Sequence, residues 1–176
     1  MSLRILDAFP SAALNGLPPF TSDGVLPPGD FAPGLSDFEE RFVETGDRER
    51  RQFLYEGLNR YRRALLDTGI PETAWMLING SFTTSKSSPG DIDIAVEVPI
   101  AKIEDMRDHP ADELFDRDSV KLRFQCDAYA IYTLPFHDPN YENFTQAYVR
   151  VWTQLFGMTR YKTTKGRVWI KAGGLK

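Results

Sequence analysis

The stretch LINGSFTTSKSSPGDIDIAVEV, residues 77–98, decides the fold that the sequence predicts. It places Gly80 and Ser81 after an apolar run, continues through a small polar loop, and sets Asp91 and Asp93 at the start of a second apolar run. Aspartate is a poor strand residue, and burying an unpaired charge is costly. Two aspartates one residue apart in such a strand therefore indicate that the fold compensates for them.

The spacing of the two aspartates predicts a cation between them. Residues two apart on a strand share a face, so Asp91 and Asp93 project together while Ile92 and Ile94 point into the core. Neighbouring carboxylates repel unless one is protonated or a cation lies between them. Oxygen ligands of this kind suit Mg²⁺, which binds a few carboxylates, keeps some waters and takes further oxygens from phosphates. We therefore expect a Mg²⁺ or Mn²⁺ site.

The loop that follows the first apolar run is suited to phosphate groups. Gly80 permits a sharp turn and the close approach of a ligand to the backbone. Successive N–H groups in such a turn form an anion site, to which the Ser81 hydroxyl adds a donor. Lys86 lies in the same loop and supplies a cation. A phosphate site beside a carboxylate metal site is what phosphoryl or nucleotidyl transfer requires.

A third carboxylate is expected from a neighbouring strand, because a site for two metal ions needs one. Asp127, within RFQCDAYAIY, is an acid in an otherwise apolar strand. A solvent-facing position with no further role is the open alternative for this residue. We predict that Asp91, Asp93 and Asp127 form the catalytic and metal-binding set, with the first two on one strand and Asp127 on its neighbour.

The rest of the chain predicts an α/β (α+β) fold, a mixed β-sheet flanked by helices. Residues 1–35 are rich in Pro and Gly and are expected to form an extended arm, followed by a single domain, residues 36–176. Ser36 and Glu39 predict a capping box for the first helix. Hydrophobic periodicity predicts the following elements: helices at 37–44, 48–68, 100–108 and 144–156, and strands at 74–79, 92–98, 120–134 and 167–172.

The composition argues against several classes of protein. With 176 residues the chain fits one domain, and its single cysteine, Cys126, excludes an internal disulfide framework. Cys126 adjoins Asp127 and is expected to face the opposite side of the strand as a buried apolar residue. His109 and His137 are too few for a zinc site. No run suggests a membrane span or a signal peptide, so we expect a cytoplasmic protein without membrane contact.

The charge is unevenly distributed. The net charge is −4, but the 34 residues after Glu142 carry seven Lys or Arg and no acid, so they sum to +7 against −11 before them. This tail either neutralises its own domain or offers a basic surface to RNA or a triphosphate. Lys162 and Lys165 are expected to be exposed within it, and the arginines of DRERRQF are expected to lie on a solvated helix face.

These motifs together resemble a known family. Gly80-Ser81, nine intervening residues, Asp91-Ile92-Asp93 and a later strand aspartate resemble the nucleotidyltransferase superfamily that includes DNA polymerase β, over roughly residues 74–134. With GVLPPGDF and ERRQFLYEGL, the likeness extends to small, poorly characterised prokaryotic nucleotidyltransferase-like proteins. The familiar form has Arg or Lys soon after Gly-Ser and a Ser before the first aspartate, whereas this chain has Phe-Thr-Thr-Ser-Lys and Gly90.

The resemblance implies a role for each motif residue. Asp91 and Asp93 would bind Mg²⁺ and the triphosphate, and Asp127 would complete the metal site and help deprotonate the acceptor. Gly80 and Ser81 would hold the triphosphate. The implied function is an enzyme, a metal-dependent nucleotidyltransferase that moves an NMP from an NTP to a protein or RNA acceptor and releases pyrophosphate.

The alternative is a catalytically weak or inactive regulatory or binding module of the same fold. Such a module would act with a protein partner, for example as part of a toxin–antitoxin or phage-defence pair. The complete acidic triad favours the enzyme, because a regulator has no need to keep all three carboxylates.

Overall fold

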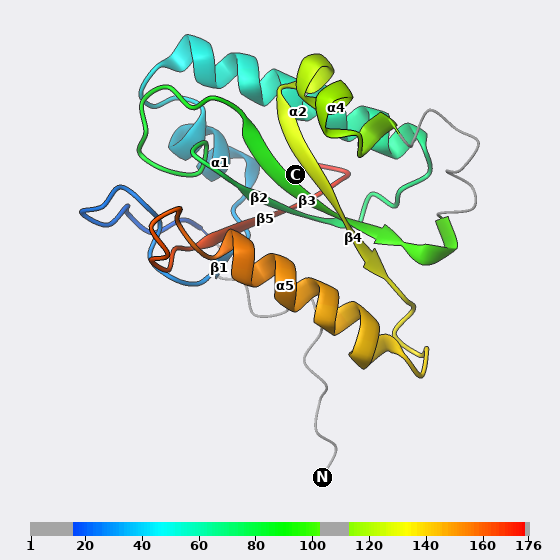
Figure 1. The fold of residues 1–176 in the computed structure, drawn as a ribbon. Helices are drawn as coiled ribbons and strands as arrows, with labels where there is room; N and C mark the ends of the chain where they lie inside the picture. The colour runs from blue at the N-terminus through cyan, green and yellow to red at the C-terminus, as the bar shows by residue number, and fades with distance from the viewer. Residues whose placement is uncertain (1–15, 103–112, 175–176) are drawn as a thin grey trace.

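A computed structural model describes residues 16–102 and 113–174, which form a five-stranded mixed sheet with helices on both faces (Figure 1). The predicted mixed α/β fold class is thereby confirmed. The strands are β1 (Asp30–Phe31), β2 (Trp75–Asn79), β3 (Ile92–Pro99), β4 (Cys126–Thr133) and β5 (Arg167–Lys171). The helices are α1 (Leu35–Phe42), α2 (Arg48–Asp67), α4 (Arg117–Phe124) and α5 (Ala147–Phe156), with a 3-10 turn η1 (Ile100–Lys102) and a π-helical turn η3 (Glu142–Gln146) that leads into α5.

The strand order is β1-β5-β2-β3-β4. The central strand β2 is antiparallel to both β3 and β5, whereas β4 is parallel to β3 and β1 is parallel to β5. Successive strand residues face opposite sides, and each face has its own core. One face packs against α1, α2 and α4, and the other packs against α5 (Figure 1). The outermost strand β4 is therefore an edge over which side chains from α4 can reach.

The long helix α2 shows why the larger core forms where it does. Its buried apolar residues recur every three or four positions and form one continuous stripe, as expected for an amphipathic helix. Asp47 caps the start by accepting from the N–H of Arg50, and Gly69, with φ +85°, follows the last turn. The helix predicted at 48–68 and the strands predicted at 74–79, 92–98 and 167–172 are confirmed to within about one residue.

The strand predicted at 120–134 is wrong in its first part. Residues 117–124 form α4, which Asp116 caps through the N–H of Ser119, and β4 begins only at Cys126. Val120 and Phe124, four residues apart, are buried, whereas Leu122 between them is 82% exposed. The alternation of apolar residues was therefore helical spacing with one exposed leucine.

The start of α1 and the segment after β3 also differ from expectation. The N-cap of α1 is Gly34, and Ser36 lies inside the helix, so the predicted capping box is wrong. Of the helix predicted at 100–108, residues 100–102 form the 3-10 turn η1, and residues 103–108 lie outside the described part of the chain. The helix predicted at 144–156 is confirmed, with η3 as its first turn.

The described part of the predicted arm, residues 16–35, packs onto the domain, and its last residue, Leu35, already belongs to α1. Leu26 and Phe31 belong to the larger core. Asp30 accepts hydrogen bonds from the Arg167 guanidinium at 2.7 and 2.6 Å and from the Trp169 indole N–H at 2.7 Å. These contacts fix β1 to β5 at one edge of the sheet. Residues 1–15 of the arm lie outside the described residues.

Cys126 has the position that the sequence predicts. Cys126 is a buried free thiol in the core beneath α2, on the face opposite Asp127, as predicted. Burial raises the pKa of this thiol, which argues against a nucleophilic role.

Across residues 16–102 and 113–174, no helix is both long enough and apolar enough to cross a membrane.

Candidate functional site

The ends of three neighbouring strands bring oxygen-bearing side chains into one row. Asn79, the last residue of β2, is the cross-strand partner of Asp93 on β3, and Asp93 is in turn the partner of Asp127 on β4. Directly opposed residues project from the same face of a sheet. Asn79, Asp93 and Asp127 therefore line one face in register. Asp91 lies two residues before Asp93, where the chain enters β3.

Gly80 is required by the carboxylate of Asp93. Its φ is +78°, a conformation that side chains other than glycine rarely adopt. A Cβ at this position would lie 2.0 Å from Oδ2 of Asp93 and 3.1 Å from its Cγ. The glycine of the Gly-Ser pair thus makes room for Asp93 as well as turning the chain away from β2.

The turn after Gly80 presents unpaired backbone donors. The Ser81 carbonyl accepts from the N–H and the hydroxyl of Thr84, at 3.3 and 2.8 Å, which closes the turn. Within the described residues, the N–H groups of Ser81, Phe82 and Thr83 donate to no acceptor. Three consecutive free donors beside a row of carboxylates are an arrangement that suits an anion.

Lys86, the predicted phosphate-binding cation, lies on an exposed part of the same loop. Its carbonyl accepts from Arg51, but its ammonium group makes no hydrogen bond or ion pair within the described residues. The structure does not bring Lys86 into contact with the three aspartates.

Asp93 is the most strongly perturbed carboxyl of the row. Burial, together with the charges of Asp91 and Asp127, raises the pKa of Asp93 to about 6. The cation that most strongly opposes this rise is Lys165, which is only 7% exposed and whose Nζ lies 3.5 Å from the Gly80 carbonyl. Burial lowers the pKa of Lys165 to about 8, and the charge of Asp93 opposes that shift.

The expectation that Lys165 is exposed is therefore wrong. The antiparallel pairing of β5 with β2 places Val168 opposite Ile78, and this register carries the preceding Lys165 to the Gly80 turn. Lys162, three residues earlier, is exposed as expected.

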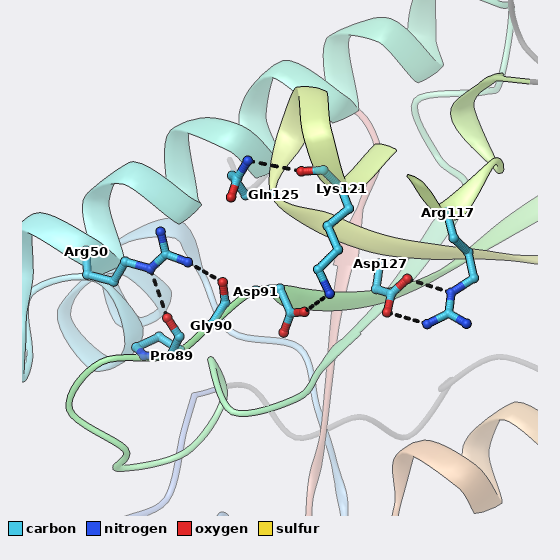
Figure 2. A network of polar contacts seen from close by, with 8 residues as sticks. All are labelled: Arg50, Pro89, Gly90, Asp91, Arg117, Lys121, Gln125 and Asp127. Atoms are coloured by element: carbon cyan, nitrogen blue, oxygen red, sulfur yellow. Dashed lines mark hydrogen bonds and ion pairs between the residues drawn. The ribbon is translucent and has the colours of Figure 1, made fainter. Parts of the chain in front are cut away.

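The other two aspartates are paired with cations from α4 (Figure 2). Arg117 donates two hydrogen bonds to Asp127, from Nε to Oδ1 and from Nη2 to Oδ2, both at 2.8 Å. Lys121 donates to Oδ2 of Asp91 at 2.7 Å. The hydrogen bonds from Arg117 lower the pKa of Asp127, and the hydrogen bond to Asp91 raises the pKa of Lys121. Residues four apart share a helix face, so both cations meet the same end of the sheet.

Two arginines of α2 fix the loop that joins Gly80 to Asp91. Arg50 donates to the carbonyls of Pro89 and Gly90 (Figure 2). Arg51 is 1% exposed, so the prediction of a solvated helix face is wrong for this residue. Its guanidinium donates to the carbonyls of Phe42, Phe82, Thr84, Lys86 and Ser87, at 2.7, 2.9, 2.9, 2.6 and 3.3 Å.

The donor types of the row fit a hard divalent cation. The three carboxylates and the Asn79 amide offer oxygen ligands only, and the Asn79 Oδ1 is buried without a hydrogen-bond partner among the described residues. In the same part of the chain, however, no group of three or more His, Cys, Asp or Glu is arranged to hold a metal ion. Arg117 and Lys121 already engage Asp127 and Asp91, so the carboxylates are directed toward cations of the protein itself.

Four residues of this site were not predicted in their positions. Asn79 had a visible signal, since it is a polar residue that ends an apolar strand directly before Gly80. Arg117 and Lys121 are four residues apart, but this spacing has meaning only once the segment is recognised as a helix. Lys165 gave no signal, because its position depends on how β5 pairs with β2.

Comparison with known proteins places the chain in a family without an assigned activity. No curated protein and no solved structure matches the chain. One family model matches residues 18–171, a span that runs from the segment before β1 through β5 and includes every residue of the row. The chain therefore belongs to DUF6932, a family of unknown function.

Proposed function

We propose that the protein is a metal-dependent nucleotidyltransferase that moves an NMP from an NTP to a hydroxyl of a protein or RNA acceptor. The observation that carries the proposal is the row Asn79, Asp93 and Asp127, in register across three strands beside the Gly80 turn. Carboxylates alone would not suggest phosphate chemistry. Their contact with a turn that has three unpaired N–H groups supports it, because such groups bind anionic oxygens.

Each group in the row has a role in this proposal. Asp91, Asp93 and Asp127 would hold Mg²⁺ or Mn²⁺, and the ion when bound would neutralise the carboxylates and polarise phosphate oxygens. The N–H groups and hydroxyl at Ser81 would bind the triphosphate. The acceptor oxygen forms a bond to the α-phosphorus, the bond from this phosphorus to the bridging oxygen of the β-phosphate breaks, and pyrophosphate leaves with the electron pair. The hydroxyl proton passes to Asp127.

The energetics of Asp93 support a binding role. A carboxyl whose pKa is raised by burial and by two neighbouring acids destabilises the empty fold when it ionises. The unpaired Oδ1 of Asn79 is a second buried polar group that adds no stability. Groups that cost stability and gather at one place are a frequent mark of a functional site.

One observation favours a second candidate, a regulatory or binding module of the same fold with little or no catalysis. Arg117 and Lys121 neutralise two of the three carboxylates from within the protein. A site that is permanently closed in this way would bind a partner or a nucleotide without transferring it.

The test is transfer of label from each α-³²P-labelled NTP, with Mg²⁺ or Mn²⁺, to a mixture of cellular RNA and protein. The wild type is compared with Asp93→Asn and with Asp37→Asn, an exposed aspartate of α1 that serves as the matched control. We expect labelling by the wild type and by the control, and at least about a hundredfold less by Asp93→Asn. Nucleotide binding by the wild type without transfer from any NTP would instead support the regulatory module.

A further inference from the structure

We propose that Arg117 and Lys121 are the phosphate-binding cations of this site, and that they exchange their carboxylate partners for the triphosphate when metal and nucleotide bind. The inference rests on the proposed function and names the residues that receive the substrate. It also supplies the phosphate-binding cations that the loop does not place at the aspartates, because Lys86 is exposed and makes no ion pair within the described residues. The cations nearest to the carboxylates come from α4 instead.

The charges of the site are balanced in the absence of a metal ion. The carboxylates of Asp91, Asp93 and Asp127 are matched by three cations, Lys121, Lys165 and Arg117. A balanced site has little net attraction for a divalent ion alone. Once such an ion is present, the site carries excess positive charge, which a triphosphate neutralises. Metal and nucleotide should therefore bind together.

Arg117 and Lys121 can change partner only if another cation takes their place. Their side chains are 62% and 52% exposed, so both can move into solvent, whereas the side chains of Asp127 and Asp91 are only 9% and 26% exposed. A metal ion at these carboxylates would supply the replacing charge. The backbone of α4 stays in place, because Val120 and Phe124 are anchored in the core. Lys165, in contrast, is buried beside Gly80 and remains where it is. Of these three cations, Arg117 and Lys121 are therefore the ones that can change partner.

Arg117 also has a geometry that suits phosphate binding. Arg117 lies before β4 and reaches across this edge strand to the face on which Asp127 and Tyr129 project, with its guanidinium 5.5 Å from the centre of the Tyr129 ring. A guanidinium that binds a carboxylate through two parallel hydrogen bonds is equally suited to two oxygens of a phosphate. Only β3 separates β4 from β2, so a triphosphate that binds at the Gly80 turn and extends over Asp93 would come within reach of this guanidinium.

The experiment measures Mn²⁺ binding by calorimetry, alone and with each NTP analogue that has a non-hydrolysable bond between the α- and β-phosphates. The wild type is compared with Arg117→Gln and Lys121→Gln. The matched control is Arg123→Gln, since Arg123 lies on the same helix and pairs with Glu113 at 2.9 Å, away from the aspartate row.

We expect the wild type to bind Mn²⁺ weakly alone and at least about tenfold more tightly with an analogue. Arg117→Gln and Lys121→Gln should bind Mn²⁺ alone about tenfold more tightly than the wild type, because a competing cation is gone, and the analogue about tenfold more weakly. Arg123→Gln should match the wild type in both measurements.

The outcomes separate this inference from the function on which it rests. Analogue binding that neither variant weakens overturns the inference alone and leaves the proposed function standing. Weaker analogue binding with no gain in Mn²⁺ affinity also overturns it, because the cations would then not compete with the metal ion. Failure of the wild type to bind any analogue with Mn²⁺ overturns the proposed function and the inference together.

Discussion

Two arginines near the candidate site differ in burial and in the groups to which they donate. Arg51 of α2 is 1% exposed and donates to five backbone carbonyls. Arg117 of α4 exposes 62% of its side chain and donates to the single carboxylate of Asp127. Removing Arg51 would leave several buried carbonyls unpaired, whereas removing Arg117 would leave the single carboxylate of Asp127, whose side chain is 9% exposed. The first arginine is part of the structure, and the second is available for function.

The largest expected effect is that of Arg51→Met. Carbonyls of Phe42 and Phe82 would lose a buried donor, and each unpaired buried acceptor costs about 1–3 kcal/mol, so the free energy of unfolding should fall by more than about 3 kcal/mol. Arg51→Lys should recover only part, because an ammonium cannot reach all five acceptors. Denaturant unfolding measures both changes.

The control for that measurement is Arg48→Ala, one turn earlier on α2. Arg48 is exposed and pairs with Glu44 at 3.5 Å, so its loss should change stability little. Equal, small effects of Arg51→Met and Arg48→Ala would contradict a structural role for Arg51.

The second effect in size belongs to Asp93, through pH. Its pKa is raised from 3.8 to about 6, so the folded state holds this proton more tightly than the unfolded chain. The resulting stability is complete below the unfolded value and is lost as pH rises through about 6. The loss amounts to up to about 3 kcal/mol. Asp93→Asn has no carboxyl to ionise at this position and does not lose this stability as the pH rises. It should therefore be more stable than the wild type above pH 6 in the presence of a chelator.

Unfolding free energies measured from pH 4 to pH 7 check this expectation. Mg²⁺ at a concentration well above its weak Kd should restore stability to the wild type above pH 6. It should have little effect on Asp93→Asn, which lacks the carboxylate that would bind the ion. Parallel pH profiles of the unfolding free energy for the two proteins would show that the pKa of Asp93 is not raised in the folded state.

The same pair of arginines shows what the sequence could reveal. Arg51 precedes Leu54, Leu58, Tyr61 and Leu65 at spacings of three and four, which is the buried stripe of α2. Its burial was therefore encoded in the periodicity, and only its charge concealed it. Arg117 was hidden for another reason, because Val120, Leu122 and Phe124 alternate as a strand would, and the exposure of Leu122 is settled only by packing.

In the candidate site, too, the sequence predicted the features that are local and missed those that depend on tertiary packing. The sequence predicted Asp91 and Asp93 beside a glycine turn, since both features lie within one short stretch. The row that Asp93 forms with Asn79 and Asp127 depends on strand register, which local patterns do not specify. The burial of Lys165 depends on the pairing of β5 with β2, two segments nearly ninety residues apart.

A smaller effect than that of Asp93 is expected for Gly80→Ala. The new Cβ would lie 2.0 Å from Oδ2 of Asp93 and would hold a φ of +78°, so we expect a loss of about 1–2 kcal/mol and a displaced carboxylate. The displacement should also abolish the rise in melting temperature that we expect from Mg²⁺ well above its Kd in the wild type. Thermal unfolding with and without Mg²⁺ measures both.

Gly90→Ala is the matched control within the same loop, because a Cβ at Gly90 meets nothing within 4 Å. It should keep the Mg²⁺ response of the wild type. If Gly80→Ala also kept that response, the contact of Gly80 with Asp93 would have no part in metal binding.

The smallest effect on stability is expected for Arg117→Gln, and this variant tests the contrast between Arg117 and Arg51 most directly. Arg117 lowers the pKa of Asp127, so its contribution is present above the unfolded pKa of the aspartate and is lost as pH falls through the folded value. The wild type and the variant should differ by no more than about 2 °C in melting temperature at pH 7, and this difference should shrink as the pH falls through the folded pKa of Asp127. Arg123→Gln, on the same helix, is the control for removing an exposed arginine. A fall at pH 7 as large as that of Arg51→Met would mean that Arg117 holds the structure together, and an arginine so placed could not leave Asp127 for a phosphate.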